Sequence, residues 1–295
     1  MRSLIVLGIV GLIAQLVDGS LGMAYGVTST TLLLTVGIAP AAASAAVHLS
    51  EVGTTLASGV SHWKFGNVDW GKVGWMAIPG GVGAFFGAVV LSSISAEAAQ
   101  PIVAIFLFSL GVYILIRFSF KVTNLIIEKP ISGKFLSPLG LVAGFLDAAG
   151  GGGWGPISTP TLLSSGRMQP RKVVGTVDTS EFVVALCASA GFLISLSFAE
   201  IPLGVVAALL AGGVIAAPLA AWLVRLLHPR VLGTAVAGVI LLTNARTFLK
   251  AVGVDPGVNY FVYAAILVIW AVALYFALSF ARRDPRPVLG TEASA

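Results

Sequence analysis

The stretch that decides the fold is "QLVDGSLGMAYG", residues 15–26, which places an aspartate and three glycines inside an otherwise apolar segment. Apolar runs long enough to cross a bilayer recur along the 295-residue chain. The chain is 57% hydrophobic and only 10% charged, with a mean hydropathy of +1.00, whereas soluble domains carry about 25% charged residues. We therefore predict an all-α polytopic membrane protein, in which a charged, glycine-rich break needs an explanation.

The pattern around the break returns once, at residues 145–170, as "FLDAAGGGGWGPISTPTLLSSGRMQP". Several features match in order between the two copies, with one inserted residue before the last pair: Asp18 with Asp147, Tyr25-Gly26 with Trp154-Gly155, Gly37 with Gly166, and His48-x-x-Glu51 with Asp178-x-x-Glu181. Internal repeats of this kind are typical of secondary transporters. The boundaries that we expect are a first membrane repeat at 1–117, a cytoplasmic linker at 118–134, a second repeat at 135–252, and a final transmembrane helix with a cytoplasmic tail at 253–295.

Each repeat is predicted to contain one broken element followed by three membrane spans. The broken elements are residues 4–37 and 135–165. The remaining apolar segments lie at 40–61, 73–93, 98–116, 172–197, 202–224, 231–250 and 258–280.

The positive charges indicate whether the broken elements cross the membrane or turn back. If both turn back, only Arg2, Arg246 and Lys250 lie on one side, and the rest of the 17 Lys and Arg residues lie on the other. If both cross, the charges divide almost evenly. Cytoplasmic loops are enriched in Lys and Arg, which favours two re-entrant hairpins, seven spans, an outside N-terminus and a cytoplasmic C-terminus. Three spans per repeat make the two repeats inverted. The alternative is that each break is a kinked span, since glycine is common where membrane helices pack.

Five acidic residues fall within membrane depth, with no Lys or Arg beside them: Asp18, Glu51, Asp147, Asp178 and Glu181. An acidic residue at a helix centre costs roughly 2.5–3.5 kcal/mol, and such residues often mark an ion or proton path. The spacing of three puts His48 with Glu51, and Asp178 with Glu181, on one helix face each. These pairs are candidates for proton handling. Asp18 and Asp147 have two open interpretations, a proton-coupling role or a structural one that caps the next half-helix.

The glycine-rich breaks predict an anion site. A half-helix that begins inside the membrane presents free backbone amides and the positive end of its dipole. Glycine lets the backbone approach a ligand closely, and nearby hydroxyls add donors. The candidate substrate-binding residues are Gly22, Tyr25, Gly26, Thr28, Ser29, His48, Gly151, Gly152, Gly153, Trp154, Gly155, Ser158 and Thr159.

The paired glycine-rich elements resemble the TauE/SafE sulfite exporter family over about residues 4–280, most specifically at "GGGGWGPISTPTLL", residues 150–163. The first repeat departs from this motif, because "GSLGMAYG" has fewer glycines and no proline after its aromatic residue. The resemblance implies export of sulfite or a small organosulfonate across the inner membrane. Our own hypothesis is that the anion lies between the hairpin tips, with Tyr25 and Trp154 beside it as gates or walls.

Five buried acids in an anion carrier leave two interpretations. In one, burial keeps some carboxyls protonated, and those protons couple anion movement to the proton gradient. In the other, the acids bind a cation or divalent metal that is itself the cargo. We favour the anion, with no cofactor and no resident metal. The partners that we expect are the anion, protons and the bilayer, with a homo-oligomer allowed and no nucleic acid. The sequence lacks HExxH, GxSxG and any nucleophile–base pair, so we expect no enzyme.

Overall fold

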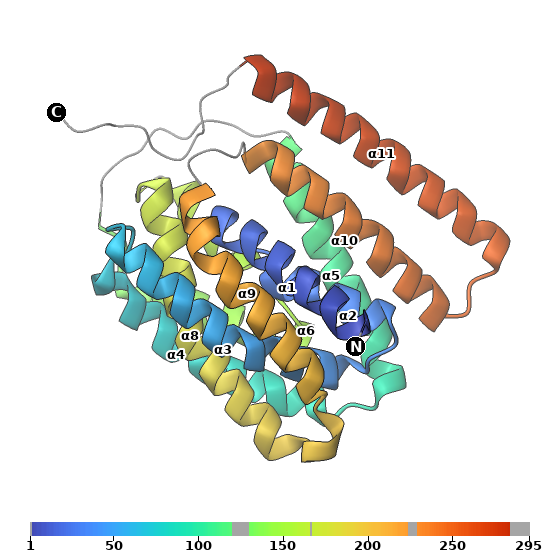
Figure 1. The fold of residues 1–295 in the computed structure, drawn as a ribbon, viewed down its shortest axis with the longest axis horizontal. Helices are drawn as coiled ribbons and strands as arrows, with labels where there is room; N and C mark the ends of the chain where they lie inside the picture. Colours follow the sequence, from blue (N-terminus) through green and yellow to red (C-terminus); the bar gives the residue numbers. More distant parts are fainter. Residues whose placement is uncertain (1, 120–129, 166, 224–228, 284–295) are drawn as a thin grey trace.

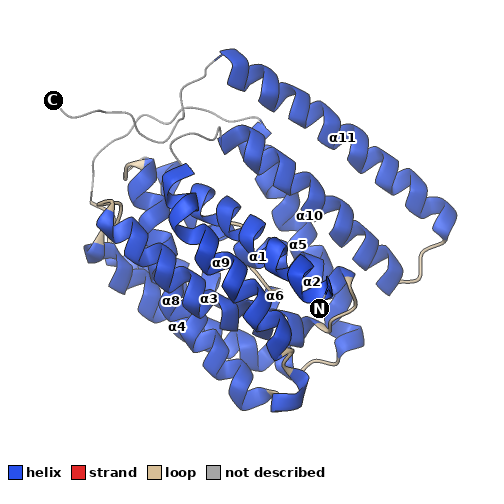
Figure 2. Ribbon diagram, viewed as in Figure 1, coloured by secondary structure: helices blue, strands red, loops and turns tan. Residues whose placement is uncertain are grey.

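The computed structural model describes residues 2–119, 130–165, 167–223 and 229–283, and the regular structure there is entirely helical (Figure 2). The first broken element forms α1 (Arg2–Leu21) and α2 (Tyr25–Thr35), and the second forms α6 (Gly133–Gly150) and α7 (Trp154–Ser165). The other helices are α3 (Pro40–Lys64), α4 (Trp70–Ser92), α5 (Ala96–Ser119), α8 (Pro170–Ser195), α9 (Leu203–Leu223), α10 (Pro229–Ala251) and α11 (Pro256–Arg283). The all-α prediction is confirmed.

Matched residues begin and end the matched helices. Gly22 and Gly151 follow the ends of α1 and α6, at φ +66° and +74°. This left-handed conformation ends a helix at little cost when the residue is glycine. Pro40 and Pro170 open α3 and α8, where the proline's missing amide hydrogen would have no helical partner. These glycine and proline signals therefore act locally and in the same way in both repeats.

The directions of the helices fit a chain that turns back within each broken element. In the first, Ile13 and Val17 of α1 line one groove with Leu32 and Thr28 of α2, which fits two antiparallel helices. For the second broken element, the helices before and after it indicate the same turn. Helices α4 and α8 run in the same direction, because Val184 lies near Gly80 and Gly191 lies near Phe85. Since α5 and the second broken element separate them in the chain, α4 and α8 would run in opposite directions if that element crossed the bundle.

Helices that correspond in the two repeats pack against each other in opposite directions. Within α3 and α8, Gly59 approaches Thr179 and His48 approaches Phe192. The pair α5 and α10 is likewise antiparallel. The contact between α4 and α6 has its counterpart in the contact between α9 and α1, and these two helix pairs are the most extensive of the others. This is the arrangement that two inverted repeats would require.

Five helices are long and apolar enough to cross a membrane by length and composition: α4, α5, α8, α9 and α11. Helix α11 lies at the edge of the molecule against α10 and exposes large apolar side chains, including Phe261 and Val268 (Figure 1). Helices α3 and α10 are long as well, but they carry polar residues that pack inside the protein, such as Ser44 and Asn244. The expected seven spans include both of these.

Parts of the expected organisation fall on residues outside the described ranges. They are 120–129 of the proposed linker and 284–295 of the proposed tail. The four-part division of the chain stays a prediction.

Candidate functional site

The two breaks cross each other in the interior. Thr159 of α7 donates a hydrogen bond from its hydroxyl to the carbonyl oxygen of Gly22, at 2.5 Å. The backbones touch as well: a Cβ on Gly26 would lie 3.0 Å from the Cα of Gly152, and one on Gly155 would lie 2.6 Å from the Cα of Met23. Each half-helix therefore begins against the break of the other repeat, as two inserted hairpins would allow.

The two aspartates that precede the breaks bind the amides of the half-helices. Asp147 Oδ1 accepts hydrogen bonds from the amides of Gly153 and Trp154, at 2.6 and 3.0 Å. Asp18 Oδ1 accepts the corresponding bond from the amide of Tyr25 at 3.3 Å. The capping geometry that the sequence allowed is therefore present at both. In this conformation those amides already have acceptors, so an anion would have to share or replace them.

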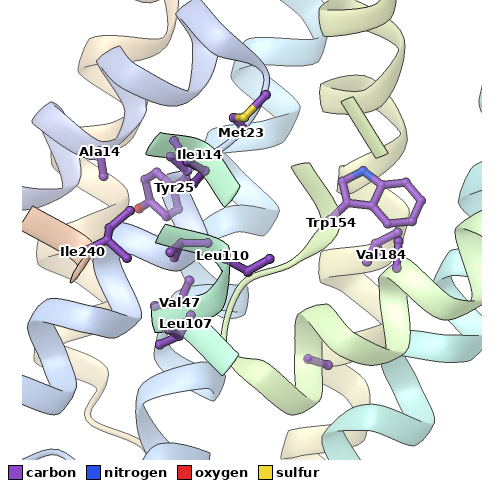
Figure 3. Packing of buried hydrophobic residues seen from close by; sticks show 14 of the residues in the cluster. Ala14, Met23, Tyr25, Val47, Leu107, Leu110, Ile114, Trp154, Val184 and Ile240 are labelled. Carbon is purple, nitrogen blue, oxygen red and sulfur yellow. The ribbon is translucent and has the colours of Figure 1, made fainter. Parts of the chain in front are cut away.

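The two aromatic residues that open the half-helices are buried, and their rings reach in opposite directions (Figure 3). The Tyr25 hydroxyl lies 3.1 Å from Ser50 Oγ on α3 and 3.3 Å from the carbonyl oxygen of Leu209. The Trp154 indole donates to the carbonyl oxygen of Val177 on α8 at 3.0 Å. Both rings thus hold a half-helix against the first long span of its own repeat.

Each aspartate also lies against the pair of titratable residues on the long helix of the other repeat. Asp147 joins His48 and Glu51, whereas Asp18 joins Asp178 and Glu181; within each group the ligand atoms lie within 4.8 Å of one another. We call these the histidine triad and the acidic triad. All six side chains are buried. The sequence placed the two members of each pair together on a helix, and only the fold adds the third.

The histidine triad can hold one shared proton. His48 Nδ1 lies 2.8 Å from the carbonyl oxygen of Ser44, which can only accept, so Nδ1 carries hydrogen. His48 Nε2 lies 3.1 Å from Asp147 Oδ2 and 3.9 Å from Glu51 Oε2. A hydrogen bond between Nε2 and Asp147 needs one proton, which either group can hold. Asp147 thus binds the histidine with one oxygen and the amides of the break with the other.

Buried hydroxyls without a hydrogen-bond partner lie on the first two turns of both half-helices. Among the described residues, no hydrogen-bond partner is present for the side chains of Thr28, Ser29, Thr30 and Ser158, all of which are buried. Ser29 and Ser158 correspond in the two repeats. Thr30 is close to the second break, since a Cβ on Gly151 would lie 3.0 Å from its hydroxyl oxygen. Buried hydroxyls of this kind need a partner such as water or a ligand oxygen.

The structure brings all the sequence-predicted site residues into one buried region, and it adds others that the sequence reasoning missed. Ser44 bonds to the carbonyl oxygen of Ala148 at 2.9 Å, and Asn244 of α10 donates to Thr31 Oγ1 at 2.7 Å. Gln15 is buried on α1. The sequence held a sign for two of these residues: Ser50 matches Ser180 in the repeat, and Ser44 lies one helical turn before His48. Asn244 had none.

Comparison with known proteins gives one family and one close relative. The model of the family described as "Sulfite exporter TauE/SafE" matches residues 7–247. The chain is 54% identical over 281 residues to the "Probable membrane transporter protein YtnM" of Bacillus subtilis (strain 168), a match that covers 95% of this chain and 94% of that protein. No solved structure matches the chain significantly.

Proposed function

Because the chain belongs to the sulfite exporter TauE/SafE family of membrane transporters, we propose that it exports sulfite or a small organosulfonate anion across the cytoplasmic membrane, coupled to protons. The transport is secondary: the anion and protons cross together, and their combined electrochemical gradients set the direction of net flux. In this proposal the two repeats are inverted in the membrane, the N-terminus lies outside and the C-terminus lies in the cytoplasm. The protein is a carrier and performs no chemical conversion of its cargo.

The observation that carries the proposal is the crossing of two half-helix N-termini beside unpartnered hydroxyls. Ser29 and Ser158 are the hydroxyl donors that we assign to the anion, with the backbone amides of 22–26 and 151–155 completing the site. Sulfite and sulfonate groups present several oxygens, each able to accept from such donors. The positive ends of both half-helices lie toward the same place, which favours negative charge there.

Proton coupling follows from the double role of Asp147. Its Oδ1 competes with an anion oxygen for the amides of Gly153 and Trp154, while its Oδ2 faces His48. A proton that settles on Asp147 makes the carboxyl a weaker acceptor, which releases the amides to the anion. Anion binding and protonation then favour each other. Glu51 and Glu181 are the neighbouring carboxyls through which we route protons to and from the triads.

Reconstituted vesicles test this function. We expect vesicles loaded with labelled sulfite, or with a small aminosulfonate, to release it when a pH gradient is imposed. The variant Glu51→Gln should lose the response to the gradient while still exchanging anion for anion. A protein that moves neither anion under any gradient would contradict the proposal, and full gradient-driven flux in Glu51→Gln would remove the proposed proton role of that residue.

The acidic triad favours one alternative, the transport of a cation. Asp18, Asp178 and Glu181 gather three carboxylates within 4.8 Å, with oxygen atoms that suit hard cations. The same vesicles distinguish the two functions. Flux of sodium or a divalent cation without flux of sulfite or sulfonate would establish the cation as cargo, and Asp178→Asn should then abolish it.

A further inference from the structure

A cavity of about 450 Å³ opens where the start of α4 meets the loop before α8 and the first turn of α8, with Pro130 from the segment before α6 also in its lining. Its lining carries four basic side chains and one acidic side chain: Lys72, Arg167, Arg171, Lys172 and Asp69. Among the described residues, the one ion pair of this cavity joins Lys72 to Asp69. The cavity therefore has an excess of positive charge, and we call it the basic pocket.

The loop before α4 is fastened to the first turns of α8. Lys172 donates from Nζ to the carbonyl oxygen of Val68 at 3.1 Å, and the amide of Asp69 donates to Thr176 Oγ1 at 2.9 Å. Arg171 donates from Nε to Gln169 Oε1 at 3.2 Å, which holds its guanidinium near the rim. These bonds tie the start of α8 to the loop before α4. The basic side chains thus share one concave surface formed from two distant parts of the chain.

The basic pocket lies close to the crossing of the breaks. On the first turns of α8, Val174 packs against the first break, where a Cβ on Gly22 would lie 3.1 Å from Val174 Cγ1. Two residues farther on, Thr176 contacts the loop of the pocket. Helix α7 joins the two places: it begins at the second break and ends just before Arg167, a length of about 18 Å at 1.5 Å per residue.

We infer that the basic pocket binds an oxyanion, either the free sulfite or sulfonate group before it reaches the breaks or the phosphate of a lipid headgroup. Arginine guanidiniums bind such groups through two parallel hydrogen bonds, and Arg167 and Arg171 are both exposed at the pocket. A concave surface lined by one sign of charge also concentrates the field and raises the local concentration of the opposite ion. The identity of the free anion rests on the proposed function, whereas the oxyanion chemistry does not.

The test compares a variant of the basic pocket with a matched control. The double variant Arg167→Gln/Arg171→Gln removes two positive charges, and Lys134→Gln removes one exposed positive charge outside the pocket. In nanodiscs of phosphatidylcholine alone, we expect the double variant to bind labelled sulfite about tenfold more weakly than the wild type and Lys134→Gln to be unchanged. In vesicles, the KM for sulfite presented from the side of the membrane on which the basic pocket lies should rise by a similar factor, while kcat stays within about twofold.

A second arm identifies the source of the oxyanion. If the pocket holds a lipid headgroup, the wild type retains phosphatidylglycerol through purification, as counted by native mass spectrometry, and the double variant loses it. If the pocket holds the free anion, sulfite binding differs between the proteins in neutral lipid. The inference is overturned if the double variant behaves like Lys134→Gln in both measurements. Because sulfite binding and lipid retention are measured without transport, this result is separate from a failure of the proposed function.

Discussion

At the scale of single residues, Asp147 connects the backbone of the second break with the protonation of the histidine triad. One of its oxygens holds two amides and the other faces His48. A structural role and a coupling role, which the sequence left as alternatives, are both geometrically available to this one carboxylate. Substitutions of different chemistry can separate them.

We expect Asp147→Asn to fold with nearly wild-type stability and to lose proton-coupled flux. Asparagine can still accept from the amides of Gly153 and Trp154, and it can donate to a neutral His48, but it cannot exchange a proton. Asp147→Ala loses every one of these bonds and should destabilise the protein by about 3–5 kcal/mol, the usual cost of leaving a buried charged partner unpaired. Thermal unfolding in detergent and gradient-driven flux measure the two effects. Wild-type coupling in Asp147→Asn would rule out the exchange of a proton at this carboxyl.

The contact between the breaks gives a second prediction for single residues. Gly152 has φ +144°, and a Cβ there would collide with the backbone of Val27. We expect Gly152→Ala to lower the free energy of unfolding by roughly 2–4 kcal/mol, since it adds a steric collision to the cost of a left-handed alanine. Gly37→Ala is the control, because Gly37 has φ +91° with open space around it, and it should cost only about 1–2 kcal/mol. Equal losses in the two variants would mean that the breaks are not in contact.

At the scale of elements, each broken element packs closely against a helix of the other repeat. Helix α6 lies against α4 so closely that a Cβ on Gly83 would collide with the carbonyl oxygen of Leu141, and it would lie 2.9 Å from the amide nitrogen of Phe145. Small residues permit this approach, and close packing of this kind drives the association of helices in membranes. Gly83 and Gly87 of α4, which both meet the backbone of α6, therefore act as packing residues.

Two alanine substitutions on α4 should therefore affect the free energy of unfolding in different ways. Gly83→Ala meets the backbone of α6 and should lower the free energy of unfolding by about 1–3 kcal/mol. Gly74→Ala lies on the exposed face of the same helix with nothing within 4 Å, and it should leave stability unchanged or raise it by up to about 1 kcal/mol, through better helix propensity. Unfolding midpoints in one detergent provide the comparison. A loss at Gly74 as large as that at Gly83 would show that the collision with α6 does not set the effect.

At the scale of the whole molecule, the path of the two broken elements decides which loops share a side of the membrane. If both broken elements turn back, Glu97 in the first turn of α5 and Glu200 before α9 lie on the same side, and Lys134 lies on the opposite side. If the broken elements cross as kinked spans, Glu97 and Glu200 lie on opposite sides. All three side chains are exposed, so each position can carry a probe.

Cysteine labelling measures this arrangement. In a Cys187→Ala background, we expect an impermeant maleimide to label Glu97→Cys and Glu200→Cys in intact cells, and Lys134→Cys only in inverted vesicles. Cys187 is the only cysteine of the chain, so its removal leaves the introduced thiol as the sole target. Labelling of Glu97→Cys and Glu200→Cys from opposite sides would establish the kinked-span arrangement instead.

The sequence by itself determined the helices and their ends. Apolar runs, the prolines at 40 and 170 and the glycines at 22 and 151 act on their own segment of chain, so their effect needs no knowledge of the rest. The repeat added which residues correspond, and with them the half-helices that begin at Tyr25 and Trp154. Because these signals are local, the resemblance to the family is visible in the order of the residues alone.

The tertiary structure alone decided which residues meet. The sequence put His48 with Glu51 and Asp178 with Glu181, but it could not show that Asp147 joins the first pair and Asp18 the second. It also gave no sign that the loop before α4 and the start of α8 would form one basic pocket. The physical reason is the same in both cases. Which helices become neighbours depends on how their small-residue faces pack together over the whole bundle, and that property belongs to no single segment.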